Sequence, residues 1–117
     1  MKGRPFLARM GFALAGLRSA WSREASFRSQ TCVAAGAALT LLIVRPNALW
    51  VAAVVLAATS VLALEAANAA IEELADTLHP GLSPGIGRAK DMAAAAVLIA
   101  SIGAAAVGCA FAYGVGS

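Results

Sequence analysis

Long apolar stretches alternate with short polar breaks along this chain, and three of the stretches contain no charged residue. They cover residues 29–44, 46–64 and 92–117. A helix that crosses a bilayer needs roughly 20 predominantly apolar residues, and the flanking sequence extends each stretch toward that length. The pattern therefore predicts an all-α membrane protein whose spans lie at residues 26–44, 47–75 and 90–114.

The segment before these spans, residues 6–23, has a helical periodicity of its own. Its large apolar residues recur three or four positions apart: Phe6, Met10, Leu14, Leu17 and Trp21. Arg18 lies off this stripe, as expected for an amphipathic helix that rests on the membrane surface. The alternative interpretation is a cytoplasmic extension of the first span.

Two breaks separate the spans. The short break, Arg45-Pro46-Asn47, contains a proline that ends one helix and is well placed to open the next. The longer break contains two prolines and several glycines, which predicts a loop at residues 76–88. Because no alternating strand pattern is present, the chain is predicted to form one helical domain over residues 1–117.

Composition and charge agree with a membrane protein and indicate its orientation. Hydrophobic residues make up 61% of the chain and charged residues 13%, whereas soluble domains carry about 25% charged residues. Most basic residues precede the first uncharged stretch, and Arg45 alone lies between the first two. The positive-inside rule therefore places the N-terminus and residues 76–91 in the cytoplasm and the C-terminus outside. No nucleic-acid partner is expected, because most of the chain belongs in a bilayer.

Four polar residues share one face of the second predicted span. At about 100° per residue, these side chains fall within roughly 80° of one another: Glu65, Asn68, Glu72 and Asp76. A carboxylate at membrane depth is costly unless it is paired, protonated or bound to a metal. Mg²⁺ commonly takes one or two carboxylates together with phosphate oxygens, so the stripe predicts a site for this cation.

Lys90 and Asp91 follow the predicted loop, at the start of the third span. A lysine there can hold a phosphate as a point charge, which completes the ingredients of phosphoryl transfer. Other roles remain open for each residue on its own. Glu65 also fits a proton-relay acid or an assembly contact, and Asn68 fits an interhelical hydrogen bond. Lys90 and Asp91 also fit an interfacial pair at a helix end.

Three blocks of sequence carry a further signal. The first two are Glu65-x-x-Asn68-x-Ala70-Ile71-Glu72-x-x-x-Asp76 and Gly87-Arg88-Ala89-Lys90-Asp91. The third lies upstream and is Gly16-Leu17-Arg18-x-Ala20-Trp21-x-x-Glu24-Ala25-x-Phe27-Arg28. In their order and spacing these blocks, within residues 16–100, resemble the prokaryotic diacylglycerol kinase family.

The resemblance implies a homotrimer in the bacterial inner (plasma) membrane, with a periplasmic C-terminus and active sites shared between neighbouring subunits. It implies that ATP phosphorylates a lipid alcohol, sn-1,2-diacylglycerol, to phosphatidic acid with Mg²⁺ as cofactor. Glu65 would be the general base that contacts the lipid hydroxyl, and Glu24 and Glu72 would bind ATP by holding Mg²⁺ together with its phosphates. Further contacts would come from Asn68, Lys90 and Asp91 to ATP, and from Arg18, Trp21, Phe27 and Arg28 to the lipid.

The chain departs from the family pattern at four positions. These are Ala69 (often serine or threonine in the family), Phe12 (usually tyrosine), Pro5 (an N-terminal arginine) and Ser83 (near a loop histidine). Arg4 and Arg9 are the nearby arginines that could replace the family's N-terminal arginine. His79 lies earlier in the loop than the family histidine.

Other functions also fit parts of the sequence. Undecaprenol kinase has the same fold, but the segment Glu24-Ala25-Ser26-Phe27-Arg28 looks more like members that act on diacylglycerol. If the protein is a small transporter or channel subunit, it should carry ions across a membrane without consuming ATP. If it is a non-catalytic assembly protein, its function should survive Glu65→Gln combined with Lys90→Ala. Neither of these last two explains why four charged residues gather at the cytoplasmic face: Glu24, Glu72, Lys90 and Asp91.

Overall fold

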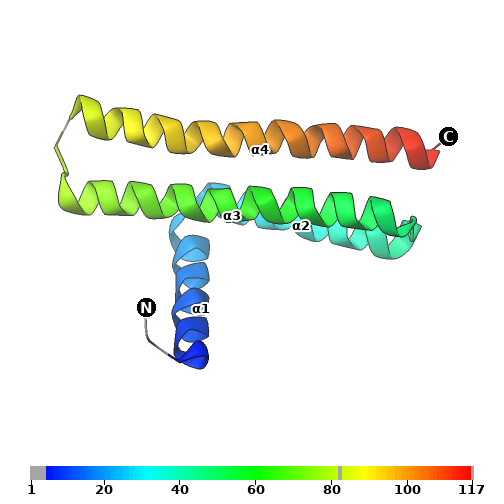
Figure 1. The fold of residues 1–117 in the computed structure, drawn as a ribbon, viewed down its shortest axis with the longest axis horizontal. Coiled ribbons are helices and arrows are strands. Elements are labelled where there is room, and N and C mark those ends of the chain that lie inside the picture. The colour runs from blue at the N-terminus through cyan, green and yellow to red at the C-terminus, as the bar shows by residue number, and fades with distance from the viewer. Residues whose placement is uncertain (1–4, 82, 117) are drawn as a thin grey trace.

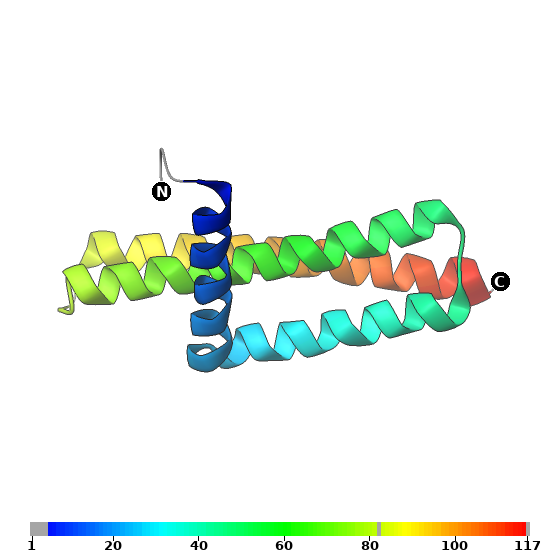
Figure 2. The ribbon, with the colours of Figure 1, turned by 90° about the horizontal axis from the view of Figure 1, so that it is seen from below.

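The computed structural model describes residues 5–81 and 83–116, which form four helices and, within these ranges, no strand (Figure 1). The helices are α1 (Phe6–Arg23), α2 (Ala25–Val44), α3 (Ala48–Leu78) and α4 (Pro84–Gly116). Helices α2, α3 and α4 run side by side in alternating directions, and α1 lies nearly at right angles to them (Figures 1 and 2). The predicted all-α fold class is confirmed. Arg4 lies outside the described residues.

Three of the helices, α2, α3 and α4, are long and apolar enough to cross a membrane, which confirms the three predicted spans by length and composition. Helix α1 covers the residues of the predicted surface helix, and its place on the membrane stays a prediction. Helices α3 and α4 have 31 and 33 residues. At 1.5 Å per residue they are about 46 and 50 Å long, which exceeds a hydrocarbon core of about 30 Å.

The extra length of α3 and α4 lies beyond α1. Figure 2 shows α1 crossing α3 well before the C-terminal end of α3. We call the described residues past this crossing, 74–81 and 83–91, the projecting end. It contains Asp76, Arg88, Lys90 and Asp91. A surface position for α1 would therefore leave these charged residues in water, beyond the apolar part of the bundle.

The turn between α2 and α3 is short because its residues end one helix and cap the next. Arg45 adopts a left-handed conformation (φ 52°, ψ 58°), and its N–H donates to the carbonyl of Leu41 at 2.9 Å. This is a common way for a helix to end. Asn47 is the N-cap of α3, since its Oδ1 accepts the N–H of Trp50 at 3.1 Å.

The predicted loop at residues 76–88 is too long. Helix α3 continues to Leu78, and α4 begins at Pro84, six residues before the predicted start of the third span at residue 90. Proline and glycine usually interrupt a helix, which is why the sequence predicts a longer loop. Proline is tolerated in the first helical turn, however, because its missing N–H has no intrahelical partner there. The carbonyl of Ser83 accepts the N–H of Gly87 at 2.9 Å, so the glycine-rich segment is helical.

The described part of the chain buries few side chains. Its buried apolar residues are Ala20, Phe27, Val61, Ala75 and Ala93, and many large apolar side chains on the spans are exposed. Exposed apolar surface on membrane spans is covered by lipid or by other protein. Near the C-terminus, the rings of Trp50 and Phe111 pack edge to face with centroids 5.6 Å apart.

Gly114 gives a test of this α3–α4 contact. A Cβ at Gly114 would lie 2.7 Å from Cζ2 of Trp50, so the indole ring must move away from Phe111. We expect Gly114→Ala to lower the free energy of unfolding by about 1–3 kcal/mol, as overpacking usually does. Gly103→Ala is the matched control, since a Cβ there meets nothing within 4 Å. Denaturant unfolding in detergent micelles measures both, and equal effects would contradict the Trp50 contact.

Candidate active site

Glu65 is the one buried charged residue of the described chain, with 6% of its surface exposed. It lies on α3 beside the start of α2, where the hydroxyl of Ser26 donates to Glu65 Oε2 at 3.0 Å. A buried carboxylate without hydrogen-bond partners would be strongly unfavourable. Ser26 therefore stabilises the acid that the sequence indicates as the candidate base.

Sequence reasoning missed Ser26. The contact joins two residues 39 positions apart, so no local periodicity reveals it. The available signal was weak: a small hydroxyl residue two positions after Glu24, at the start of an apolar run. The partner is supplied by the packing of α2 on α3.

Asn68 and Glu72 form the next layer of the stripe, one and two helical turns after Glu65. Asn68 Nδ2 donates to Glu72 Oε1 at 3.3 Å, and both side chains are half-buried. Asn68 Oδ1 is buried and has no hydrogen-bond partner in the described structure. An unpaired amide oxygen beside a carboxylate is a donor set that suits a hard cation or a polar ligand.

Lys90 faces the end of the same stripe from the neighbouring helix. Its Nζ lies 2.5 Å from Asp76 Oδ1, an ion pair that joins α4 to α3 across the short loop. The Lys90 side chain is 35% exposed and that of Asp76 is 65% exposed. The ion pair holds the ammonium at the projecting end, where it is accessible to a soluble ligand. Asp91 is the next residue and is exposed.

Glu24 lies at the joint between α1 and α2. It is the single residue between the two helices, with an extended backbone (φ −117°, ψ 108°). It lines a recess of about 650 Å³ between α1 and α3, to which Glu73 also contributes. Successive residues of a helix point about 100° apart, so Glu72 lies on a different face of α3 from Glu73.

Within the described residues, no three His, Cys, Asp or Glu side chains lie close enough to hold a metal ion. Glu24 and Glu72 are expected from the resemblance to share Mg²⁺, and the structure gives them different neighbours. Mg²⁺ sites that contain phosphate need only one or two carboxylates, so the acids present still fit a metal that arrives with a nucleotide.

The residues expected on the lipid side build the corner between α1 and α2. Arg28 Nη1 donates to the carbonyl of Trp21 at 2.7 Å and so ties α2 back to α1. Phe27 is buried at this corner, whereas Trp21 and Arg18 are exposed on α1.

An ion pair of 2.7 Å between Arg23 Nη1 and Glu73 Oε1 also joins α1 to α3. Both of its side chains are more than 60% exposed. Because solvent screens such a pair, it stabilises the fold by at most about 1 kcal/mol.

The structure also describes residues at or near the positions where the sequence departs from the family pattern. Ser83 Oγ lies 3.5 Å from the backbone nitrogen of Ile86 at the start of α4, and His79 is the exposed C-cap of α3. Ala69 lines the recess beside α1. Phe12 and Arg9 are exposed on α1.

Comparison with known proteins settles the family. Residues 11–112 match the prokaryotic diacylglycerol kinases. The chain belongs to this family. Relatives named diacylglycerol kinase from Escherichia coli strain K12, Escherichia coli O157:H7 and Shigella flexneri are each 40% identical over 104 residues. The aligned part covers 85% of this chain and 81% of each relative. These matches confirm the family that the three sequence blocks indicate.

The Ser26–Glu65 hydrogen bond predicts a specific effect on activity. We expect Ser26→Ala to lower lipid-dependent ATP turnover by about 10- to 100-fold, because a hydrogen bond to a charged group contributes about 1.5–3 kcal/mol. Ser26→Thr keeps the hydroxyl and should restore most of the turnover. Ser22→Ala is the matched control, since that hydroxyl donates only to the carbonyl of Ser19 on the exposed face of α1. Equal turnover in the Ala and Thr variants of Ser26 would remove this hydrogen bond from the site.

Proposed function

We propose that the protein transfers the γ-phosphoryl group of ATP to the hydroxyl of a membrane lipid, sn-1,2-diacylglycerol, and so forms phosphatidic acid. The observation that carries the proposal is the buried Glu65, held by Ser26 in the first turn of α2, next to the α1–α2 joint. A carboxylate at the headgroup boundary is within reach of a lipid hydroxyl, and the Asn68–Glu72 pair and Lys90 follow toward the projecting end. The name of the relatives supports the same lipid.

The reaction is a direct displacement at the γ-phosphorus. The lipid hydroxyl oxygen attacks this phosphorus while the bond to the β,γ-bridging oxygen breaks, and ADP leaves. Glu65 accepts the hydroxyl proton as the new O–P bond forms. Ser26 orients the Glu65 carboxylate by donating to Oε2, which leaves Oε1 for the substrate proton.

The nucleotide would lie against the polar stripe and the projecting end. Glu24 and Glu72 would hold Mg²⁺, and the unpaired Oδ1 of Asn68, whose Nδ2 donates to Glu72, offers a further oxygen. When bound, this ion neutralises charge on the ATP phosphates. Lys90 would add a positive charge whose position is set by Asp76. Asp91, the next residue of α4, would also contact the nucleotide. On the lipid side we assign contacts to four residues of the α1–α2 corner: Arg18, Trp21, Phe27 and Arg28.

In the cell we place the protein in the bacterial inner membrane, with α1 on the cytoplasmic surface, the projecting end in the cytoplasm and the C-terminus in the periplasm. The basic residues before the first span support this orientation. We further propose a homotrimer with shared active sites. The exposed apolar faces of the spans support it, because neighbouring subunits can cover such faces. The mass of the protein–detergent complex by light scattering tests the trimer.

Glu65→Gln tests the general base. We expect turnover to fall by about 10²–10⁴-fold, because a positioned base contributes that much, while ATP binding is retained. The assay measures ATP turnover and lipid product in mixed micelles with Mg²⁺, offering diacylglycerol and undecaprenol separately. Glu73→Gln is the matched control on the same helix, since it removes only an exposed ion pair with Arg23. Turnover of undecaprenol alone would change the substrate, and an active Glu65→Gln variant would exclude Glu65 as the base.

Lys90→Met tests the phosphate contact. Methionine is one atom shorter than lysine and uncharged, so we expect KM for ATP to rise at least about tenfold, with a smaller change in KM for the lipid. Arg88→Met is the control, because Arg88 is an exposed cation two residues away on the same helix. An equal rise in KM for ATP in both variants would show that the projecting end acts only through its overall charge.

A further inference from the structure

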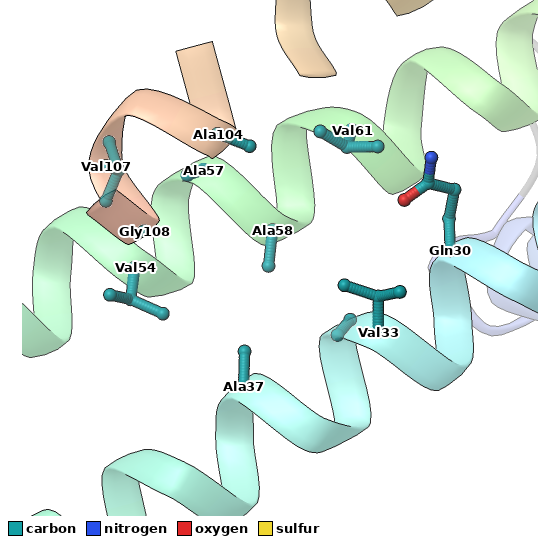
Figure 3. Close-up of a pocket in the computed structure, with 11 residues that line it drawn as sticks. Gln30, Val33, Ala37, Val54, Ala57, Ala58, Val61, Ala104, Val107 and Gly108 are labelled. Atoms are coloured by element: carbon teal, nitrogen blue, oxygen red, sulfur yellow. The ribbon is translucent and has the colours of Figure 1, made fainter. Parts of the chain in front are cut away.

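Two hollows in the described part of the chain differ in the chemistry that they offer. The cavity of about 190 Å³ between α2, α3 and α4 is apolar, and Gln30 is the single residue of its lining with a polar side chain (Figure 3). The recess of about 650 Å³ between α1 and α3 is lined by three charged residues, Arg23, Glu24 and Glu73. Ligand pockets commonly measure about 300–1,000 Å³. The recess therefore has the size of a ligand site and, unlike the cavity, charged groups that can bind a polar ligand.

The cation of the recess, Arg23, is joined directly to a proposed metal ligand. Arg23 is the last residue of α1 and Glu24 follows it, so their Cα atoms are about 3.8 Å apart. Both residues line the recess. Because they are neighbours in sequence, they enter an active site together, whichever subunit provides the other residues. A nucleotide that brings Mg²⁺ to Glu24 thus brings its phosphate oxygens within reach of the Arg23 guanidinium.

In the structure, the Arg23 guanidinium is paired with Glu73. Arg23 Nη1 lies 2.7 Å from Glu73 Oε1, and the two side chains are 66% and 62% exposed. Solvent screens such a pair, so little free energy is needed to separate it. A triphosphate offers more negative charge and more acceptor oxygens than one carboxylate, and a guanidinium can bind it through two parallel hydrogen bonds. Arg23 can therefore exchange Glu73 for a nucleotide phosphate.

We propose that Arg23 is a further nucleotide-binding residue, which leaves Glu73 when ATP enters the recess and binds the ATP phosphates beside Glu24. The inference rests on the proposed lipid kinase function and adds a residue to it. Neither the helical periodicity nor the family resemblance indicates Arg23, which occupies an unspecified position of the upstream sequence block. Before the nucleotide arrives, Glu73 keeps the guanidinium at the recess and competes for it, so the apparent affinity for ATP is lowered by the small free energy of the pair. Glu73 itself contacts no nucleotide in this exchange.

Nucleotide binding tests the exchange. The dissociation constant (Kd) of the β,γ-methylene analogue of ATP, which cannot transfer its γ-phosphoryl group, is measured with Mg²⁺ by isothermal titration calorimetry in micelles. We expect Arg23→Gln to raise Kd about tenfold, because a charge-assisted contact with phosphate is lost. Glu73→Gln should lower Kd by up to about fivefold, since it removes the competing carboxylate. Arg45→Gln is the control and should leave Kd unchanged, because Arg45 is an exposed cation in the turn between α2 and α3, at the opposite end of the bundle.

A double variant that combines Arg23→Gln with Glu73→Gln separates the exchange from two simpler explanations. We expect its Kd to match that of Arg23→Gln, because Glu73 acts on the nucleotide only through Arg23. A Kd that returns to the wild-type value would show that both charges act only through their electric field, and it would overturn the proposal. An equal rise in both single variants would also overturn it, since the ion pair would then only tie α1 to α3. A wild-type protein that binds no analogue would instead overturn the proposed function, so the two failures are distinguishable.

Discussion

The hydrogen bond from Ser26 to Glu65 is the interaction on which the rest of the site depends. It satisfies a carboxylate that is otherwise buried among apolar side chains, and it does so from the first turn of a different helix. The same bond fixes the start of α2 against the middle of α3. Since α1 is joined to α2 two residues before Ser26, the position of α1 along the bundle is set by this contact as well.

Polarity is sorted along the bundle axis. From Glu65 toward the α3–α4 loop, polar residues follow at each turn, and Lys90 pairs with the last of them from α4. In the opposite direction the interior is lined by alanine, valine and glycine, which leave a cavity rather than a tightly packed core. Within a few helical turns, α3 therefore changes from polar side chains that suit a water-soluble ligand to apolar side chains that suit a lipid. A lipid kinase needs this juxtaposition, because its two substrates arrive from different solvents.

Much of the fold was predictable because hydropathy and helical periodicity are local properties. The three uncharged stretches predict the three spans, and the 3.6-residue repeat brings Glu65, Asn68 and Glu72 to one face. The loop between α3 and α4 was predicted too long because Pro84 was treated as a breaker, whereas it occupies a first helical turn. Ser26 and the Arg23–Glu73 pair were missed because their contacts depend on how helices pack. Glu24 was identified only through the family resemblance, since a lone acid among arginines has no periodic signal.

The joint at Glu24 has a consequence for how variants there are interpreted. A single extended residue connects α1 to α2, so its backbone sets the direction of α1. Its side chain lines the recess between α1 and α3. Glycine at this position would remove the carboxylate and loosen the corner together, because glycine has far greater backbone freedom. Glutamine removes the charge and keeps the corner. One inserted residue that continued α1 would rotate α2 by about 100° about its axis, and Gln30 and Ser26 would then face the bilayer instead of α3.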